Sequence, residues 1–381
     1  MSKRHQAVVV GAGVIGLAVA NRLQSSKGFD VCIVAENIPD NDCTSDKSSM
    51  RSTAWASPWA GAHWRAWSSN QDTQLQKMEL DTYLAMLDVA QKEPSSGIST
   101  APGIDLFEEF SGERPWYAAK VKDSAEIPQE NLPAGIRYGL QYTTLLIDVP
   151  RYLVYLKDKF IKAGGQIHKH KLSHIHEATG FASEISAARP AVVVNCTGLG
   201  SMELGGVNDA NMYPIRGQTV VVHAPEAKCT VTRVGCLFSY VIPRGDGTAV
   251  IGGTAERGCW DDRPDAQATQ MILQRTLDLE PNLLPGGERV WDNKSINEKT
   301  AALEKAIVSV NVGFRPAREG GVCMQAQTLY APASDKPFSV VHCYGHAGYG
   351  YQSSIAFAES VFRLVKERSE AAYSTGVGND V

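Results

Sequence analysis

The sequence lacks the cysteine clusters that hold metal ions or frame small disulfide-rich domains. Its eight cysteines are spread over 381 residues, and none forms a Cys-x-x-Cys pair. In a chain of this length, such a spread indicates buried thiols in a reducing compartment. We therefore expect neither a bound metal nor a disulfide framework.

Long hydrophobic runs and an excess of positive charge are missing as well. No apolar stretch reaches the roughly 18 residues that a membrane-spanning helix needs. The formal net charge is −4, which argues against nucleic acid as a partner because phosphate binding favours clustered basic residues. The first expected strand begins close to Met1, so we expect no secretory signal before the fold. We interpret the Asn-x-Ser/Thr sequons at Asn195 and Asn293 as chance matches.

The N-terminus has the pattern of a strand, a glycine turn and a helix. Residues 6–10 form a short apolar run, and Ile15, Val19 and Leu23 then recur at helical spacing. Another apolar run, at residues 31–34, predicts a second strand. Together these elements predict one βαβ unit.

The turn of this unit matches G-x-G-x-x-G. The first glycine allows a tight turn, the second lets the backbone approach a pyrophosphate, and the third allows close packing of helix on strand. The helix start then offers N–H groups to the phosphates. An acidic residue 20 positions beyond the third glycine is suited to ribose hydroxyls and disfavours a 2′-phosphate. The expected contacts are Gly11, Gly13, Val14, Ile15, Gly16 and Glu36. The pattern predicts dinucleotide binding without separating FAD from NAD.

Further nucleotide-binding elements are expected in the middle and at the end of the chain. Residues 191–194 read as a buried strand that runs into a glycine turn, and residues 353–371 have the period of a helix. Short strands alternate with turns over residues 213–253. We therefore predict an α/β fold in two parts. A discontinuous Rossmann-like nucleotide-binding domain comprises residues 1–70, 150–210 and 313–371. A second domain with a mixed or antiparallel sheet comprises residues 71–149 and 211–312.

A series of motifs resembles the D-amino-acid oxidase family, which includes D-aspartate oxidases, and is most similar to its fungal and yeast branch. The motifs follow the family's order and span nearly the whole chain. They are the glycine motif, residues 57–64 (SPWAGAHW), 194–200 (VNCTGLG), 214–218 (PIRGQ), 240–243 (YVIP), 252–254 (GGT), 313–316 (GFRP) and 344–350 (YGHAGYG). The resemblance implies FAD as the cofactor and a substrate-binding second domain. It also implies oxidative deamination of a D-amino acid, with hydride transfer to the flavin and formation of hydrogen peroxide from oxygen.

The resemblance also implies further cofactor contacts. Carried over by motif, these are Ser52, Thr53, Gly61, Ala62, His63, Leu172, Thr197, Gly198, Gly348, Tyr349, Gly350, Tyr351 and Gln352. The family is thought to use no side-chain base, because the flavin does the chemistry and the protein supplies orientation. We therefore interpret His63 and His346 as structural or flavin-facing.

Three residues are matched to the substrate. Arg315 matches the arginine that grips the α-carboxylate, for which a planar guanidinium is suited; the alternative is a structural ion pair. Tyr240 matches a tyrosine that holds the same carboxylate; otherwise it is an edge-strand aromatic. Arg233 is similar to an arginine that contacts the side-chain carboxylate in D-aspartate oxidases; otherwise it is a solvent-facing arginine on a lid.

Arg233 makes D-aspartate the favoured substrate, because a second cation in the pocket needs an anion to offset it. A neutral D-amino acid, glycine or sarcosine remains an alternative, and Ala255 departs from the tyrosine or arginine usual at its position. More distant alternatives are an NAD-dependent dehydrogenase and a non-catalytic flavoprotein. The resemblance implies a peroxisomal location and a homo-oligomer. However, the chain ends at Val381 without a Ser-Lys-Leu type signal, so the cytoplasm is the alternative.

Overall fold

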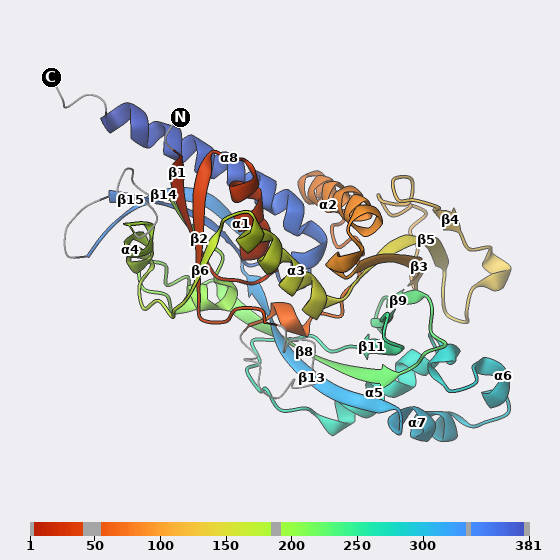
Figure 1. Ribbon diagram of the computed structural model, residues 1–381. Coiled ribbons are helices and arrows are strands. Elements are labelled where there is room, and N and C mark those ends of the chain that lie inside the picture. Colours follow the sequence, from red (N-terminus) through yellow and green to blue (C-terminus); the bar gives the residue numbers. More distant parts are fainter. Residues whose placement is uncertain (1–3, 41–54, 184–191, 333–336, 377–381) are drawn as a thin grey trace. The chain divides into compact units, whose positions relative to one another are not determined.

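The computed structural model describes residues 4–40, 55–183, 192–332 and 337–376, which fall into two compact units (Figure 1). The first unit comprises Met1–Pro58, Pro150–Ile215 and Arg315–Val381, and the second comprises Trp59–Val149 and Arg216–Phe314. Each unit has its own sheet and its own hydrophobic core.

The first unit contains a six-stranded sheet in the order β14-β15-β7-β1-β2-β6. The strands are β1 (His5–Val10), β2 (Phe29–Ala35), β6 (Gln166–Lys169), β7 (Val192–Asn195), β14 (Cys323–Tyr330) and β15 (Pro337–Tyr344). All neighbours are parallel except β14, which pairs antiparallel with β15 at the edge. In this register, Val10, Val34, Asn195 and His342 lie side by side at the carboxyl ends of four parallel strands. Ligands of open α/β sheets bind beyond such an edge.

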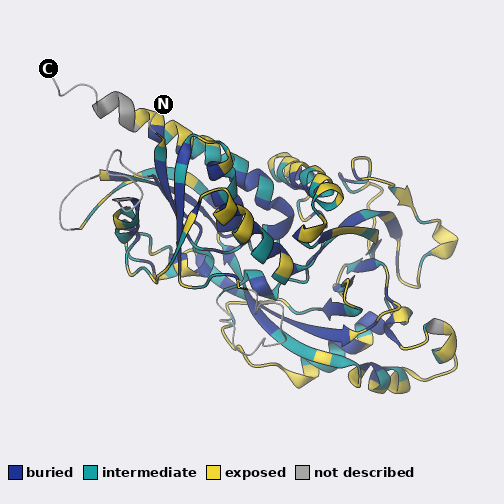
Figure 2. Ribbon diagram, viewed as in Figure 1, coloured by how far each residue is buried: buried dark blue, intermediate teal, exposed yellow. Residues whose placement is uncertain are grey.

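Helices cover both faces of this sheet. The helices of the unit are α1 (Val14–Ser25), α3 (Val149–Lys162), α4 (Ala178–Ser183) and α8 (Gly350–Gly376). Helices α1 and α8 lie against each other on one face (Figure 1), and α4 packs on β1 and β2 from the other. The central strands are consequently buried along their length (Figure 2). This double burial explains why their sequences are continuous apolar runs rather than alternating ones.

The second unit contains a larger mixed sheet in the order β12-β8-β11-β10-β9-β3-β5-β4, with β13 paired to β8. The strands are β3 (Ile98–Phe107), β4 (Ala125–Glu126), β5 (Tyr138–Ile147), β8 (Met212–His223), β9 (Thr230–Val234), β10 (Ser239–Pro243), β11 (Thr248–Gly252), β12 (Glu256–Arg257) and β13 (Ile307–Arg318). Its helices are α2 (Thr73–Lys92), α5 (Ala266–Leu277), α6 (Glu288–Trp291) and α7 (Ile296–Glu304). Apolar side chains of β8, β10 and β11 pack against α5 and α7 to form the core of this unit.

The predicted α/β class, with one parallel Rossmann-like sheet and one mixed sheet, is confirmed. Residues 59–70 were predicted to belong to the first domain, but they cluster with the second unit. The reason is backbone pairing with the end of β5. Ala62 N–H donates to Ile147 O at 3.4 Å, and Trp64 N–H donates to Leu145 O at 2.8 Å.

Candidate active site

The glycine turn between β1 and α1 has no room for side chains. A Cβ on Gly11 would lie 2.6 Å from the Cys196 carbonyl oxygen, and one on Gly16 would lie 2.0 Å from the Gly11 carbonyl oxygen. Gly11 also has a φ of +105°, which L side chains rarely adopt. Helix α1 begins directly after Gly13, which has no side chain to cap it, and its first turn contains no acidic residue. The start of α1 is therefore suited to an anionic group.

A second helix begins beside this turn. A Cβ on Gly350, the first residue of α8, would lie 3.8 Å from a methyl carbon of Val14. Both helix starts are tied to the 3₁₀ turn η3 (Ser57–Trp59). The Val14 N–H donates to Ser57 Oγ at 3.0 Å, and the Tyr351 hydroxyl donates to Ser57 O at 2.9 Å. Sequence reasoning did not single out Ser57, although it lies in a quoted motif.

The ends of β2 and β6 bring Glu36 and Leu172 to the same side of the glycine turn. Glu36 directly follows β2, its side chain is exposed, and its carboxylate lies 3.3 Å from Lys171 Nζ. Leu172 packs on the buried cluster that includes Val10 and Val34. Both residues thus lie beyond the carboxyl ends of parallel strands, where ligands of open α/β sheets bind, and their contacts to the adenosine end of a dinucleotide stay a prediction.

A buried polar group lies under the turn that follows β7. Asn195 is fully buried, which excludes glycosylation of its sequon in the folded protein. Its Oδ1 accepts hydrogen bonds from Thr197 N and Oγ1 at 3.2 and 2.8 Å, and its Nδ2 lies 3.2 Å from His342 Nδ1. Burial lowers the pKa of His342 to about 4, so this histidine is neutral near pH 7. Asn195 thus fixes Thr197, an expected cofactor contact, and this role of the asparagine was not predicted from the sequence.

Arg315 lies beside the glycine-rich loop that precedes α8. A Cβ on Gly348 would lie 3.5 Å from Arg315 Cδ and 3.8 Å from its Nε. The neighbouring backbone holds this arrangement, because Ala347 N–H donates to Pro316 O at 2.9 Å and His346 forms a bridge with Ala317. The structure therefore brings the expected carboxylate-binding arginine together with the loop expected to meet the flavin.

The phenol of Tyr240, in β10, lies over the main chain at the end of β11. Cβ atoms on Gly252 and Gly253 would lie 2.7 and 2.8 Å from its hydroxyl oxygen. Tyr240 is half-buried and stands opposite Gly252 on β11 and Thr232 on β9. The two glycines provide the flat surface on which this ring rests.

The structure does not bring Arg233 together with Tyr240. In the β9–β10 ladder Tyr240 pairs with Thr232, and successive side chains of a strand point to opposite faces. Arg233 instead donates from Nε to Glu108 Oε1 at 2.6 Å, and Glu108 Oε2 accepts from Cys236 N at 2.7 Å. Burial alone raises the pKa of Glu108, but the hydrogen bonds from Arg233 and the following backbone outweigh it and lower the pKa. The positive charge of Arg233 is thus already offset within the chain by a residue that the sequence analysis missed.

The two histidines of the quoted motifs are neutral. Burial, aided by Arg65, lowers the pKa of His63 to about 3, and burial lowers that of His346 to about 3 as well. His63 Nε2 is buried without a hydrogen-bond partner among the residues that the structure describes. A neutral, buried ring agrees with a structural or cofactor-facing role and not with a cationic one.

The lowered pKa of His346 predicts that acid destabilises the protein. Between pH 6.5 and 3 the unfolded state binds a proton at this position and the folded state does not, so stability falls as pH falls. From pH 6.5 to pH 5 this single group accounts for a loss of about 2 kcal/mol. In urea unfolding at pH 7 and pH 5, His346→Gln should show a smaller pH-dependent loss than the unmodified protein. An equal loss in both would show that His346 does not titrate in this way.

The remaining expected cofactor contacts lie in three different parts of the chain. Ser52 and Thr53 lie outside the described residues. Gly61 and Ala62 lie in the second unit, where a Cβ on Gly61 would meet Ile242 at 2.5 Å. Tyr349, Gly350, Tyr351 and Gln352 all lie at the start of α8 or just before it.

The residues of the first unit fit a dinucleotide. The glycine turn is a cradle that any Cβ would fill, and two helix starts meet beside it. The buried indole N–H of Trp55, two residues before Ser57, has no hydrogen-bond partner among the described residues.

Within the described residues no group of three or more His, Cys, Asp or Glu side chains is placed to hold a metal ion. Nor does any helix in the described part of the chain have the length and hydropathy needed to cross a membrane.

Comparisons with known proteins identify the family of this chain. Residues 6–364 match the family model described as FAD dependent oxidoreductase. A D-amino-acid oxidase of Schizosaccharomyces pombe is 35% identical, with 94% of this chain and 95% of the relative covered. A D-aspartate oxidase of Cryptococcus neoformans is 31% identical, with 94% and 95% covered. Glycine oxidase from Bacillus cereus shares the fold, with a TM-score of 0.67 at 16% identity over 96% of this chain and 98% of that one. The chain therefore belongs to the family of FAD-dependent oxidoreductases, and FAD is its cofactor.

Proposed function

We propose that this protein oxidatively deaminates D-amino acids to 2-oxo acids, with release of ammonia and hydrogen peroxide. The observation that supports this most is Arg315 beside Gly348, at the loop that leads into α8. A guanidinium held there by a strand and a glycine loop can grip a carboxylate through two parallel hydrogen bonds. Bound FAD would supply the two-electron redox chemistry, with the substrate Cα–H as hydride donor and oxygen as the final electron acceptor.

The chain's own residues then have roles in binding and orientation. The glycine turn and the start of α1 would hold the phosphates of FAD, Glu36 would hold a ribose, and the loop that leads into α8 would meet the flavin. Arg315 fixes the α-carboxylate and so the direction of the Cα–H bond, and Tyr240 adds a hydroxyl to the same carboxylate. Because burial lowers the pKa of both His63 and His346 to about 3, neither histidine is expected to titrate near pH 7.

Arg315 requires only an α-carboxylate, so the geometry is compatible with neutral D-amino acids. Arg233 is not free to bind a second carboxylate of the substrate, because it is paired with Glu108. D-aspartate is the second candidate, and two of the relatives are named D-aspartate oxidase, at 31% and 29% identity. For Arg233 to serve a D-aspartate side chain, its guanidinium would have to exchange Glu108 for the substrate.

The test is peroxide production by the FAD-loaded protein on D-alanine, D-aspartate, D-glutamate and L-aspartate. Higher kcat/KM on D-alanine than on D-aspartate supports the neutral class, and the reverse order supports the acidic class. Peroxide from none of the D-substrates, despite bound flavin, contradicts the proposed function.

Arg233→Ala separates the two candidates. If Arg233 serves only Glu108, the KM values for D-aspartate and D-alanine should change together, by less than about threefold. The melting temperature should fall, because Glu108 is left without its main donor. Glu108→Gln is the matched control, because it removes the same ion pair and keeps Arg233. A rise in KM confined to D-aspartate in Arg233→Ala would instead place this guanidinium on the substrate.

A further inference from the structure

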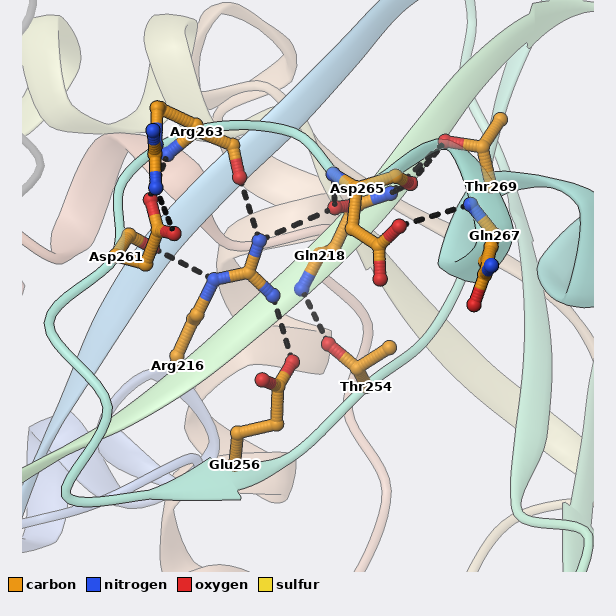
Figure 3. Close-up of polar contacts among 9 residues, drawn as sticks. All are labelled: Arg216, Gln218, Thr254, Glu256, Asp261, Arg263, Asp265, Gln267 and Thr269. Atoms are coloured by element: carbon orange, nitrogen blue, oxygen red, sulfur yellow. Dashed lines mark hydrogen bonds and ion pairs between the residues drawn. The ribbon is translucent and has the colours of Figure 1, made fainter.

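A buried arginine in the second unit holds the long segment between β11 and α5, which includes the short strand β12 (Figure 3). Arg216, at 3% exposure on β8, donates from Nε to Asp261 O at 2.6 Å, from Nη1 to Glu256 Oε1 at 2.6 Å and from Nη2 to Arg263 O at 2.7 Å. All three acceptors belong to residues 254–265, the segment that joins β11 to α5. A single guanidinium thus fixes three points of one loop.

Gln218 completes this arrangement from the same face of β8. It is fully buried, and its Oε1 accepts from Asp265 N at 2.7 Å while its Nε2 donates to Asp265 O at 2.8 Å. Its backbone N–H donates to Thr254 Oγ1 at 2.9 Å, and Thr254 N–H donates to Gln218 O at 3.2 Å. The segment is therefore pinned at both ends by Gln218 and in between by Arg216 (Figure 3).

One end of the segment borders Tyr240. A Cβ on Gly253 would lie 2.8 Å from the Tyr240 hydroxyl oxygen and 3.0 Å from Gln218 O, so this glycine is enclosed between the two. If Thr254 shifted relative to β8, the adjacent Gly253 would move with it. The main chain beneath the Tyr240 phenol would then shift as well. The hydrogen bonds between Gln218 and Thr254 therefore affect the position of Tyr240 through Gly253.

The middle of the segment borders the strand of Arg315. Trp260 lies between Glu256 and Asp261, two of the three residues that Arg216 holds, and is 50% exposed. Its ring lies edge-on to Phe314, with ring centroids 5.3 Å apart and planes at 68°. Phe314 is 3% exposed and directly precedes Arg315 in β13. The segment therefore contacts the immediate surroundings of both residues assigned to the substrate carboxylate.

We infer that Arg216 is a positioning residue for substrate binding, acting through residues 254–265 on Tyr240 and on the strand of Arg315. The inference rests on the proposed function for the identity of the ligand. A simple link between a strand and a helix needs no such device, because most connections are short and stabilised by local turns. Lysine cannot replace Arg216 here, because its compact ammonium cannot reach three acceptors that lie in different directions.

The test is Arg216→Lys in the FAD-loaded protein. We expect the KM for D-alanine to rise about tenfold with kcat changed less than about twofold, the pattern of lost substrate binding. The Kd for propionate, which has a carboxylate but no amino group, should rise by a similar factor in calorimetry. FAD content should stay unchanged, because neither Arg216 nor residues 254–265 belong to the glycine turn or to the other expected cofactor contacts. Arg114→Lys is the control, since Arg114 forms an exposed ion pair with Glu126 in the same unit.

Unchanged KM and propionate Kd in folded Arg216→Lys would overturn the inference. So would a loss of FAD and kcat without a change in KM, because that is the result of a purely structural role. If Arg216→Lys does not fold, Glu256→Gln decides the matter, since Glu256 is half-exposed and accepts one N–H of the same guanidinium. It should raise both constants by a smaller factor, and unchanged constants contradict the inference. Propionate binding needs no turnover, so failure of the inference is distinguishable from failure of the proposed function.

Discussion

Replacing Arg315 by leucine should lower kcat/KM for D-alanine by about 10²–10³-fold, because truncating one partner of a buried charge pair costs 2–5 kcal/mol. Arg315 lies against Gly348, so a substrate held by its guanidinium meets the loop before α8 in one orientation. Leucine keeps most of the volume and removes every donor. Arg315→Lys keeps the charge without the planar fork and should show an intermediate loss.

Steady-state peroxide production measures the loss of kcat/KM, and flavin absorbance measures the bound FAD in the same samples. The flavin content of Arg315→Leu should equal that of the unmodified protein, since the glycine turn is untouched. Arg363→Leu is the control, because Arg363 is an exposed arginine of α8 in the same unit. Full activity in Arg315→Leu would mean that Arg315 forms a structural ion pair and that another residue binds the carboxylate.

Replacing Gly16 by alanine should weaken FAD binding by about 100-fold or more. The new Cβ would lie 2.0 Å from the Gly11 carbonyl oxygen, which belongs to the backbone and can move only with the whole turn. Overpacking of this kind costs 1–3 kcal/mol or more, and each 1.4 kcal/mol is a tenfold change in affinity. The shifted turn would also misplace the N–H groups at the start of α1.

Flavin content after gel filtration and FAD titration of the apoprotein measure this effect. Gly28→Ala is the matched control, because its Cβ would meet only Ser26 Oγ, at 3.8 Å, and its backbone is not left-handed. It should keep its flavin and its melting temperature. Normal FAD affinity in Gly16→Ala would show that the turn does not hold the pyrophosphate.

Local patterns predicted the elements that we propose to bind FAD. A β-branched run, three glycines and a helical period have direct physical consequences, and β1, α1 and β2 formed where the pattern placed them. The buried strands of the parallel sheet were recognisable for the same reason, since burial on both faces requires continuous apolar residues. The class of the fold followed from these segments.

The features that the sequence did not predict depend on contacts between residues far apart in the chain. Residues 59–70 joined the second unit because of pairing with β5, which lies about 80 positions further along the chain. The ion pair of Arg233 with Glu108 joins residues 125 positions apart, so the sequence pattern did not reveal it. The roles of Ser57 and Asn195 also depend on contacts that only the folded chain creates.

The most direct test of the account is anaerobic mixing of the FAD-loaded protein with D-alanine, followed by flavin absorbance. Rapid loss of the oxidised flavin spectrum with D-alanine, no change with L-alanine, and recovery on admitting oxygen are the results we predict. D-aspartate in the same experiment assigns the side-chain class. A flavin that stays oxidised with every D-amino acid, or that L-alanine reduces equally fast, would contradict the proposed D-amino acid oxidase.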